Sequence, residues 1–449
     1  MMRKPVSRKL TVFPLVAATY FMVSGGPSGI EEIVQDSGYR LALLILLLTP
    51  LIWSLPTSLM VGELSAAIPA EGGFYIWVRR AMGRFWGFQE AWLSLAASLF
   101  DMASYPALFV LSLAQLWPPA NQGHNGIFIA SGVILACVLW NLFGSRAVGN
   151  GSILLGVLLL SPFVVIIVLA LLHHHSLHDV TAAHTAPQGW LAAMMIAMWN
   201  YMGWDNASTV AAEVENPQKT YPRVMMLTLA AIVISYAIPV IAVWSTHLQP
   251  GFWSEGSWAS IAELLGGRWL GITLIIGSMI STFGIVNSLT MSYSRLPVAM
   301  AQEGDLPRFF ARKLSSGTPW SSIAACGLAW TITVFILGTD LDRLVLLDIL
   351  LYGTSLVLEF VALVTLRLRE PLLPRPFTVP GGLMGAILSG VGPTALLVIA
   401  FLEKRHEEGQ QHLGGIGMVT LALIFMAAGV LLYWLMRWWS RGKTLSATS

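Results

Sequence analysis

The sequence predicts an all-α integral membrane protein with twelve transmembrane helices, and three observations support this fold class. The chain of 449 residues is 56% hydrophobic and only 11% charged, whereas soluble domains carry about 25% charged residues. Its mean hydropathy is +0.71. Apolar runs of about 20 residues, the length that crosses a bilayer, recur along the whole chain. No separate soluble domain is visible in this composition.

The twelve expected spans follow one another with short connections. They cover roughly residues 10–36, 40–68, 83–116, 126–143, 150–172, 188–214, 221–247, 268–300, 319–338, 342–367, 383–402 and 414–439. The first apolar run is too long for a cleaved signal peptide and is interpreted as the first span. Both cysteines, Cys137 and Cys326, lie inside apolar runs, so a disulfide framework is not expected.

Two of these spans are interrupted at their middles by residues that break helices or carry charge. The first contains Ser24-Gly-Gly-Pro-Ser-Gly29, and the sixth contains Met202-Gly-Trp-Asp205. Backbone freed from helical hydrogen bonds at membrane depth persists only where protein or a water-filled cavity satisfies it. Paired broken helices in the two halves of a transporter indicate a substrate site near the bilayer midplane.

The breaks also predict how the chain is divided. Because they lie five spans apart, we expect two five-helix repeats of inverted topology, over residues 10–172 and 188–367. Two additional helices follow at 383–439. The whole chain, 1–449, is expected to form a single transporter domain.

Basic residues are distributed unevenly between the two sides of the expected bundle. With the N-terminus placed in the cytoplasm, 20 of the 25 Lys and Arg residues fall on inner segments. The five on the outer side are Arg40, Arg268, Arg343, Lys404 and Arg405. Such asymmetry predicts a multi-pass protein of the cytoplasmic membrane with both termini in the cytoplasm.

Histidines follow the opposite distribution. All nine fall on outer loops, including His173, His174, His175 and His178. Outer segments avoid Lys and Arg but tolerate neutral histidine, and this tolerance explains the distribution of histidines better than a metal site does. No metal ion and no cofactor are predicted.

The glycine-rich break of the first span is a candidate ligand site. Glycines allow backbone conformations closed to other residues, and Pro27 removes one donor and stops the helix. A half-helix starting near Ser28 would present free N–H groups and a positive dipole end to a ligand carboxylate. Predicted substrate contacts here are Ser24, Gly25, Gly26 and Gly29. The alternative is a kink for close helix packing.

Asp205 and Asp101 are the acids expected nearest the middle of the membrane. An acid at that depth costs several kcal/mol unless it is paired, protonated or hydrated. Asp205 could bind an ammonium group, carry a proton, or cap a half-helix of residues 206–213. Tyr105 lies one turn beyond Asp101, and both are predicted to contact substrate.

Aromatic rings for cation–π contacts are expected from Trp199, Tyr201 and Trp204, with ordinary packing as the alternative.

Further acids are candidates for gating or proton coupling. Glu90 shares a helical face with Asp101, and Asp348, Tyr352, Ser355 and Glu359 share one face of the tenth span. Glu31 and Glu32 could line the outward path or be solvated at its mouth. The gating and proton-coupling candidates are Glu32, Glu90, Asp205, Tyr352 and Glu359. Because no Lys or Arg is expected near the membrane centre, the cavity should favour cations.

These segments resemble the amino acid–polyamine–organocation superfamily of secondary transporters. The hallmarks are the glycine break, the stretch Trp199-Asn-Tyr-Met-Gly-Trp-Asp205-Asn-Ala-Ser, Glu213-Val-Glu-Asn-Pro217 and Ser294-Arg-Leu-Pro-Val-Ala-Met-Ala-Gln-Glu-Gly-Asp-Leu-Pro307. Closer likeness is to the polyamine uptake transporter and L-type amino acid transporter-like group. It rests on Val23-Ser-Gly-Gly-Pro-Ser-Gly-Ile-Glu31, Pro69-Ala-Glu-Gly-Gly73, Phe85-Trp-Gly-Phe-Gln89, Asp101 with Tyr105-Pro106, and Leu373-Pro-Arg-Pro-Phe-Thr-Val-Pro380.

The resemblance implies a LeuT-type fold with alternating access. In similar exchangers a Trp of the sixth span gates the substrate and an acid six residues later acts in binding or proton sensing, roles that map onto Trp199 and Asp205. Several sodium-independent relatives place a Lys in the fifth span. No Lys lies between Gly149 and Leu172, so proton coupling through such a lysine is not supported.

The predicted function is secondary active transport, by proton-coupled uptake, of polyamines or amino acids. The alternative is an amino-acid permease or exchanger for neutral or cationic amino acids. Expected partners are the small-molecule substrate, H⁺ and membrane lipid, with no nucleic acid. An ion channel would need a filter or pore ring, and an enzyme would need assembled acid–base groups. Neither feature is visible in the sequence. The sequence does not indicate the oligomeric state.

Overall fold

The computed structural model describes residues 9–172, 177, 189–337, 341–406, 412–413 and 416–446. The first half contains α1 (Val12–Val23), α2 (Glu31–Thr49), the π-helical turn η1 (Pro50–Ser54), α3 (Leu55–Ala67), α4 (Gly73–Met82), α5 (Arg84–Leu116), η2 (Pro118–Asn121), α6 (Asn125–Asn141) and α7 (Ser145–Leu172). The expected histidine cluster, His173–His175 and His178, lies outside the described residues, as do the basic residues Arg3, Lys4 and Arg8.

The second half begins with the other interrupted span. It contains α8 (Trp190–Trp199), the 3₁₀ turns η3 (Trp204–Thr209) and η4 (Ala211–Glu213), α9 (Pro217–Trp244), η5 (Pro250–Phe252), α10 (Ser257–Gly266), α11 (Arg268–Tyr293), α12 (Arg295–Gln302), η6 (Arg308–Ala311), α13 (Trp320–Leu337) and α14 (Leu341–Arg369). The chain ends with α15 (Gly382–His406), a two-residue hairpin of β1 (His412–Leu413) and β2 (Ile416–Gly417), and α16 (Met418–Ser446).

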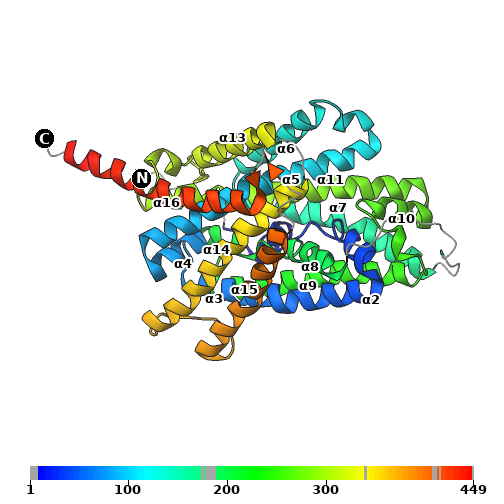
Figure 1. Cartoon of the computed structure of the whole chain (residues 1–449), viewed down its shortest axis with the longest axis horizontal. Helices are drawn as coiled ribbons and strands as arrows, with labels where there is room; N and C mark the ends of the chain where they lie inside the picture. Colours follow the sequence, from blue (N-terminus) through cyan, green and yellow to red (C-terminus); the bar gives the residue numbers. More distant parts are fainter. Residues whose placement is uncertain are drawn as a thin grey trace, which may run out of the picture.

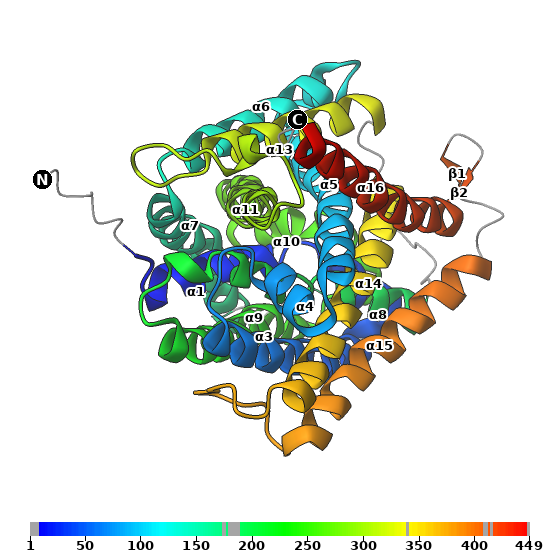
Figure 2. The same ribbon diagram turned by 90° about the vertical axis from the view of Figure 1, so that its left-hand side faces the viewer.

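The helices form one elongated bundle in which most of them run along the long axis (Figure 1). Figure 2 looks along that axis and shows α11 end on, with α5, α6 and α7 around it, all three of which it contacts. The helix α1 packs against α7, α9 and α11, while α15 and α16 lie at the periphery (Figure 2). The first interrupted span is therefore packed among uninterrupted helices through α1, whereas α8 of the second interrupted span contacts chiefly α2.

Within the described residues, nine helical segments are long and apolar enough to cross a bilayer. They coincide with nine of the twelve expected spans. The other three expected spans contain shorter helices: α1 and α8 beside the two breaks, and the 17-residue α6. The chain is therefore a multi-pass, all-helical membrane protein apart from the short hairpin, and the total of twelve spans stays a prediction.

Several local features differ from the expected spans. The half-helix after the first break begins at Glu31, not near Ser28, and continues into the next span through a kink at Gly38, where φ is +71°. After the second break the expected half-helix over 206–213 is formed by two short 3₁₀ helices, η3 and η4, and not by a continuous α-helix. The short helices α4 and α10, which the sequence pattern did not indicate, lie in connections.

A short connection, residues 69–73, is pressed against the second half of the broken sixth span. The N–H of Gly72 donates to the carbonyl of Thr209 at 2.9 Å, and the N–H of Phe74 donates to Ser208 Oγ at 3.2 Å. A Cβ on Gly73, where φ is +35°, would lie 2.0 Å from Ser208 Oγ. Only glycine fits this approach.

Ion pairs join several helices at the end of the bundle opposite α10 (Figure 1). The buried carboxylate of Asp305 accepts hydrogen bonds from Tyr75, Arg79 and Arg84 at 2.7, 2.7 and 2.5 Å. Glu63, also buried, pairs with Arg367 and Arg375. A buried carboxylate is stable only with such partners, because an unpaired charge there is strongly destabilising.

Candidate functional site

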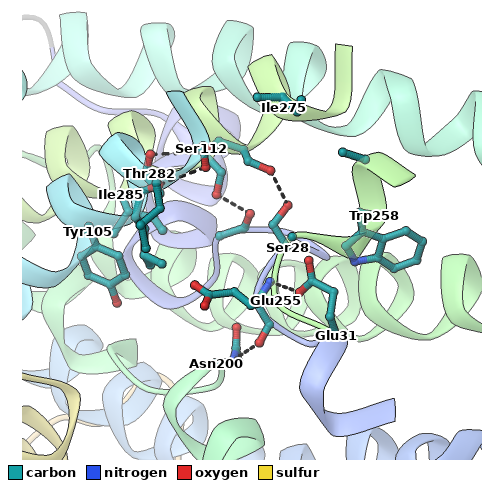
Figure 3. Close-up of a pocket in the computed structure, with 18 of the residues that line it drawn as sticks. Ser28, Glu31, Tyr105, Ser112, Asn200, Glu255, Trp258, Ile275, Thr282 and Ile285 are labelled. Atoms are coloured by element: carbon teal, nitrogen blue, oxygen red, sulfur yellow. Dashed lines mark hydrogen bonds between the residues drawn. The ribbon is translucent and has the colours of Figure 1, made fainter. Parts of the chain in front are cut away.

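Two cavities lie along the middle of the bundle, one on each side of an aromatic pair. The larger, which we call the wide cavity, has a volume of about 300 Å³ and opens beside α10. Its lining comes from the first break, α5, α8, the loop before α10, and α11 (Figure 3). The smaller, which we call the narrow chamber, has a volume of about 10 Å³. That is barely room for one water molecule.

The backbone of the first break is hydrogen-bonded mainly by side chains of the protein itself. The N–H of Gly26 donates to Ser24 Oγ at 3.0 Å, and the N–H of Gly29 donates to Glu31 Oε2 at 2.5 Å. Asn200 Nδ2 donates to the Gly29 carbonyl at 3.0 Å, and Ser281 donates to the carbonyl of Gly25. This is how polar backbone is accommodated inside the bundle.

The sequence predicts that free N–H groups at the first break bind a ligand carboxylate, and these contacts can be compared with that prediction. Glu31 supplies a carboxylate at the first turn of α2, where the helix dipole favours negative charge. Gly25 and Gly29 line the wide cavity. Ser24 instead shares a hydrogen bond of 2.7 Å with the Tyr236 hydroxyl, and Gly26 packs against Leu159. Of the four predicted substrate contacts, Gly25 and Gly29 thus line the cavity. Ser24 and Gly26 instead make contacts within the protein that hold the broken segment.

Tyr105 and Trp199 separate the two cavities. Their rings are stacked, with centroids 5.6 Å apart and planes inclined by 12°. Both residues line the wide cavity and the narrow chamber. The stacked pair thus forms part of the wall that the two cavities share.

The narrow chamber contains two aspartates and several tyrosines. Asp101 and Asp348 line it together with Tyr293 and Tyr352. The Tyr293 hydroxyl donates to Asp101 Oδ2 at 2.9 Å. Asp348 reaches the chamber from α14, on the same face as Tyr352. The chamber is therefore acidic and rich in hydroxyl groups.

Asp205 lies behind Tyr352, and 1% of its surface is exposed. The Tyr352 hydroxyl donates to Asp205 Oδ1 and accepts the N–H of Gly203 at 2.9 Å. The following residue, Asn206, accepts a hydrogen bond of 2.8 Å from Ser292. The second break is thus held by Tyr352 and Ser292, and Asp205 reaches the chamber through Tyr352.

Glu90 and Glu359 lie deeper, near Asp205. Both are fully buried, and within the described part of the chain none of their carboxyl oxygens has a hydrogen-bond partner. Both interact electrostatically with Asp205, and the carboxyl groups of Glu359 and Asp205 approach each other closely. Unsatisfied buried carboxyl groups in a native structure are unusual and point to a functional role.

The remaining predicted site residues lie away from both cavities. The Tyr201 hydroxyl donates to the Leu46 carbonyl at 2.8 Å, and Trp204 Nε1 donates to the Tyr201 carbonyl at 2.9 Å. Both side chains are buried. Glu32 is exposed, whereas its neighbour Glu31 lines the wide cavity. Of the three aromatic residues expected beside Asp205, Trp199 is the one that lines the cavities.

Some cavity residues were not indicated by the sequence. Tyr293 is one residue of an apolar helix, and Asn200 follows the more conspicuous Trp199. Glu255 and Trp258 belong to the connection that contains α10. The only available signal was the unusual number of polar and aromatic residues in that connection.

Interrupted helices around two acidic cavities, inside a bundle of apolar helices, define a membrane transporter. The chain belongs to the amino acid permease family, whose model matches residues 16–423, within the amino acid–polyamine–organocation superfamily. Members of this family are transporters and not enzymes.

Individual relatives cover most of the chain. The polyamine transporter RMV1 of Arabidopsis thaliana is 34% identical over 88% of this chain and 81% of its own length. The polyamine transporter PUT1 of Oryza sativa subsp. japonica is 33% identical over 92% of this chain and 77% of its own length. The serine/threonine exchanger SteT of Bacillus subtilis is 27% identical over 73% of this chain and 76% of its own length. This chain is thus similar to transporters of polyamines and of amino acids.

Proposed function

We propose that this protein is a secondary active transporter that takes up polyamines by a proton-coupled mechanism. One observation carries the choice of substrate. Among the described residues that line the two cavities are the acids Glu31, Glu255, Asp101 and Asp348, and no Lys or Arg. A polyamine carries several ammonium groups and no carboxylate, so acids and aromatic faces satisfy it.

The position of Glu31 supports the same choice. The N–H of Gly29, which could have bound a substrate carboxylate, is occupied by the Glu31 side chain. An amino acid would have to displace this contact and bring its carboxylate next to that of Glu31. Likeness to polyamine transporters over most of the chain agrees with this reasoning.

An amino-acid permease or exchanger is the second candidate. The glycine-rich break and the likeness to a serine/threonine exchanger favour it. In that case Gly25 and Gly29 would contact the carboxylate, and one acid of the narrow chamber would bind the amine.

The proposed mechanism uses a repeated architecture. Contacts between helices occur in pairs that an inverted five-helix repeat over 10–172 and 188–367 would produce. The contact of α1 with α9 matches that of α8 with α2, and the contact of α5 with α14 matches that of α11 with α7. The two helices over 383–439 would then be additions to a single LeuT-type domain.

In this mechanism Trp199 and Tyr105 form the gate between the wide cavity and the narrow chamber. Asp101 would bind an ammonium group of the substrate once the gate opens. Asp205, Glu90 and Glu359 would carry the coupled proton, with Tyr352 linking them to the chamber. The support is the proximity of Glu90 and Glu359 to Asp205 and the complete burial of both glutamates.

A flux measurement tests the function. The purified protein in proteoliposomes is expected to accumulate labelled putrescine or spermidine against its gradient when the lumen is alkaline relative to the bath. A protonophore should abolish accumulation. Leucine, serine and arginine serve as competing substrates. Accumulation of these amino acids without polyamine uptake would establish the second candidate, and uptake unaffected by the protonophore would refute proton coupling.

We propose that the protein lies in the cytoplasmic membrane with both termini inside the cell. The asymmetry of Lys and Arg supports this. Single cysteines at Ser7 and Ser446, in a background lacking Cys137 and Cys326, should react with an impermeant maleimide only after the cells are permeabilised. A cysteine replacing Ser254, on the exposed loop before α10, is the matched outer control. Labelling of either terminus in intact cells would reverse the assignment.

A further inference from the structure

We infer that the wide cavity is an ammonium-binding subsite of its own, in which Glu31 and Glu255 bind one cationic end of a polyamine before the Tyr105–Trp199 stack opens. This inference rests on the proposed function and extends it. It adds two acidic residues in the wide cavity to the acids already assigned to the narrow chamber and its surroundings.

The first argument is space. The wide cavity, at about 300 Å³, reaches the size typical of small-molecule sites. The narrow chamber, at about 10 Å³, cannot hold a substrate in this conformation. A ligand that meets the protein in this state must therefore bind first in the wide cavity, above the aromatic stack.

The second argument is charge. Glu31 is 3% exposed and is held by the N–H of Gly29, so its carboxylate has a fixed position. Glu255, which is exposed at the cavity edge, is close enough to interact electrostatically with Glu31. Figure 3 shows both beside Asn200, on one wall of the cavity. Because the lining contains no Lys or Arg among the described residues, a bound ammonium group would be attracted to both acids without competition from a basic side chain of the lining.

The third argument is the rest of the lining. Leu108, Leu111, Ile275 and Ile285 provide apolar surface for a methylene chain, and the Tyr105–Trp199 stack forms the floor. Trp258 closes another wall, with its Nε1 donating to the Pro27 carbonyl at 2.7 Å. Apolar walls with a few acids at one side fit an alkyl chain that carries charged nitrogens.

The two acids should contribute unequally because their burial differs. A hydrogen bond to a buried charge is worth more than an exposed ion pair. Glu31→Gln retains an oxygen to accept the Gly29 N–H, so the loop should be preserved. It is expected to weaken spermidine binding about tenfold or more. Glu255→Gln should weaken it only about two- to fivefold.

Calorimetric titration of the purified protein tests this, with spermidine, putrescine and the monoamine n-butylamine as ligands. The matched control is Glu263→Gln, which neutralises an exposed acid of α10 that lines neither cavity and should bind spermidine as the native protein does. Both cavity variants should weaken binding of n-butylamine as well as of spermidine, because the subsite binds a single ammonium group. In transport, Glu255→Gln should raise KM for spermidine about two- to fivefold. Melting temperatures near the native value would show that the variants are folded.

The outcomes distinguish failure of the proposed subsite from failure of the proposed polyamine transport. Native-like spermidine affinity in both Glu31→Gln and Glu255→Gln would overturn the subsite while leaving a polyamine transporter in place. An equal loss in Glu263→Gln would also overturn it, because the loss would then come from general surface charge. A native protein that binds amino acids and no polyamine would overturn the proposed substrate, and the subsite with it.

Discussion

Asp205→Asn is expected to reduce transport about 100-fold or more while leaving the protein folded and inserted in the membrane. Asparagine has the shape of aspartate, and its oxygen can still accept the hydrogen bond from Tyr352. What is lost is the negative charge and the ability to take up a proton. A charge-assisted hydrogen bond alone is worth about 1.5–3 kcal/mol, and loss of a coupling group adds to it.

Initial rates of spermidine uptake in proteoliposomes, at saturating and subsaturating substrate, measure this effect. Asp36→Asn is the control, because Asp36 is also largely buried but lines neither cavity. Near-native uptake by Asp205→Asn at both concentrations would remove Asp205 from the mechanism. A loss accompanied by poor insertion would be uninformative about charge, so surface expression is measured in parallel and uptake is expressed per inserted molecule.

Asp101→Asn is expected to weaken polyamine binding by about 1–3 kcal/mol, or roughly five- to 150-fold. A polyamine can place one ammonium group on Asp101, whereas a neutral amino acid needs at most one acid for its amine. Binding of neutral amino acids should therefore change less. Tyr293→Phe is the matched variant, because it removes the 2.9 Å hydrogen bond to Asp101 and keeps the negative charge.

Affinities for putrescine, spermidine, leucine and arginine in the native protein and both variants decide the matter. Charge recognition predicts a large loss in Asp101→Asn and a small one in Tyr293→Phe. Equal losses for all four ligands would instead mean that Asp101 organises the chamber through Tyr293. If the native protein binds leucine and ignores polyamines, the amino-acid candidate prevails and Asp101 is no longer an ammonium site.

Long apolar runs predicted most of the fold because the bilayer sets helix length. The expected span at 83–116 and α5 (Arg84–Leu116) agree almost residue for residue. Both breaks were visible, since glycine, proline and a lone acid are conspicuous in an apolar run. The join at Gly38 was not predicted, because a single positive φ lets two helices continue without a loop. The expected half-helix over 206–213 is present only as two short 3₁₀ helices, η3 and η4.

The candidate site was only partly accessible from the sequence. Periodicity places Asp348 and Tyr352 on one helix face, but it cannot show that this face meets Tyr293 of α11. The same limit applies to Glu31 and Glu32, which are adjacent in sequence and differ in burial. Which of two neighbouring acids turns inward depends on the helix start, and the N–H of Gly29 decides it in favour of Glu31.

The tight contact between Gly73 and Ser208 has a consequence for the interpretation of natural sequence variants. Gly73 lines neither cavity, so a missense change there could be dismissed as harmless. Yet even alanine would place its Cβ 2.0 Å from Ser208 Oγ and 2.5 Å from the Ser208 carbonyl carbon. The strain would be transmitted to the turn that carries Asp205, only three residues away along the chain. A variant at this glycine should therefore be classed with substitutions of the transport machinery itself.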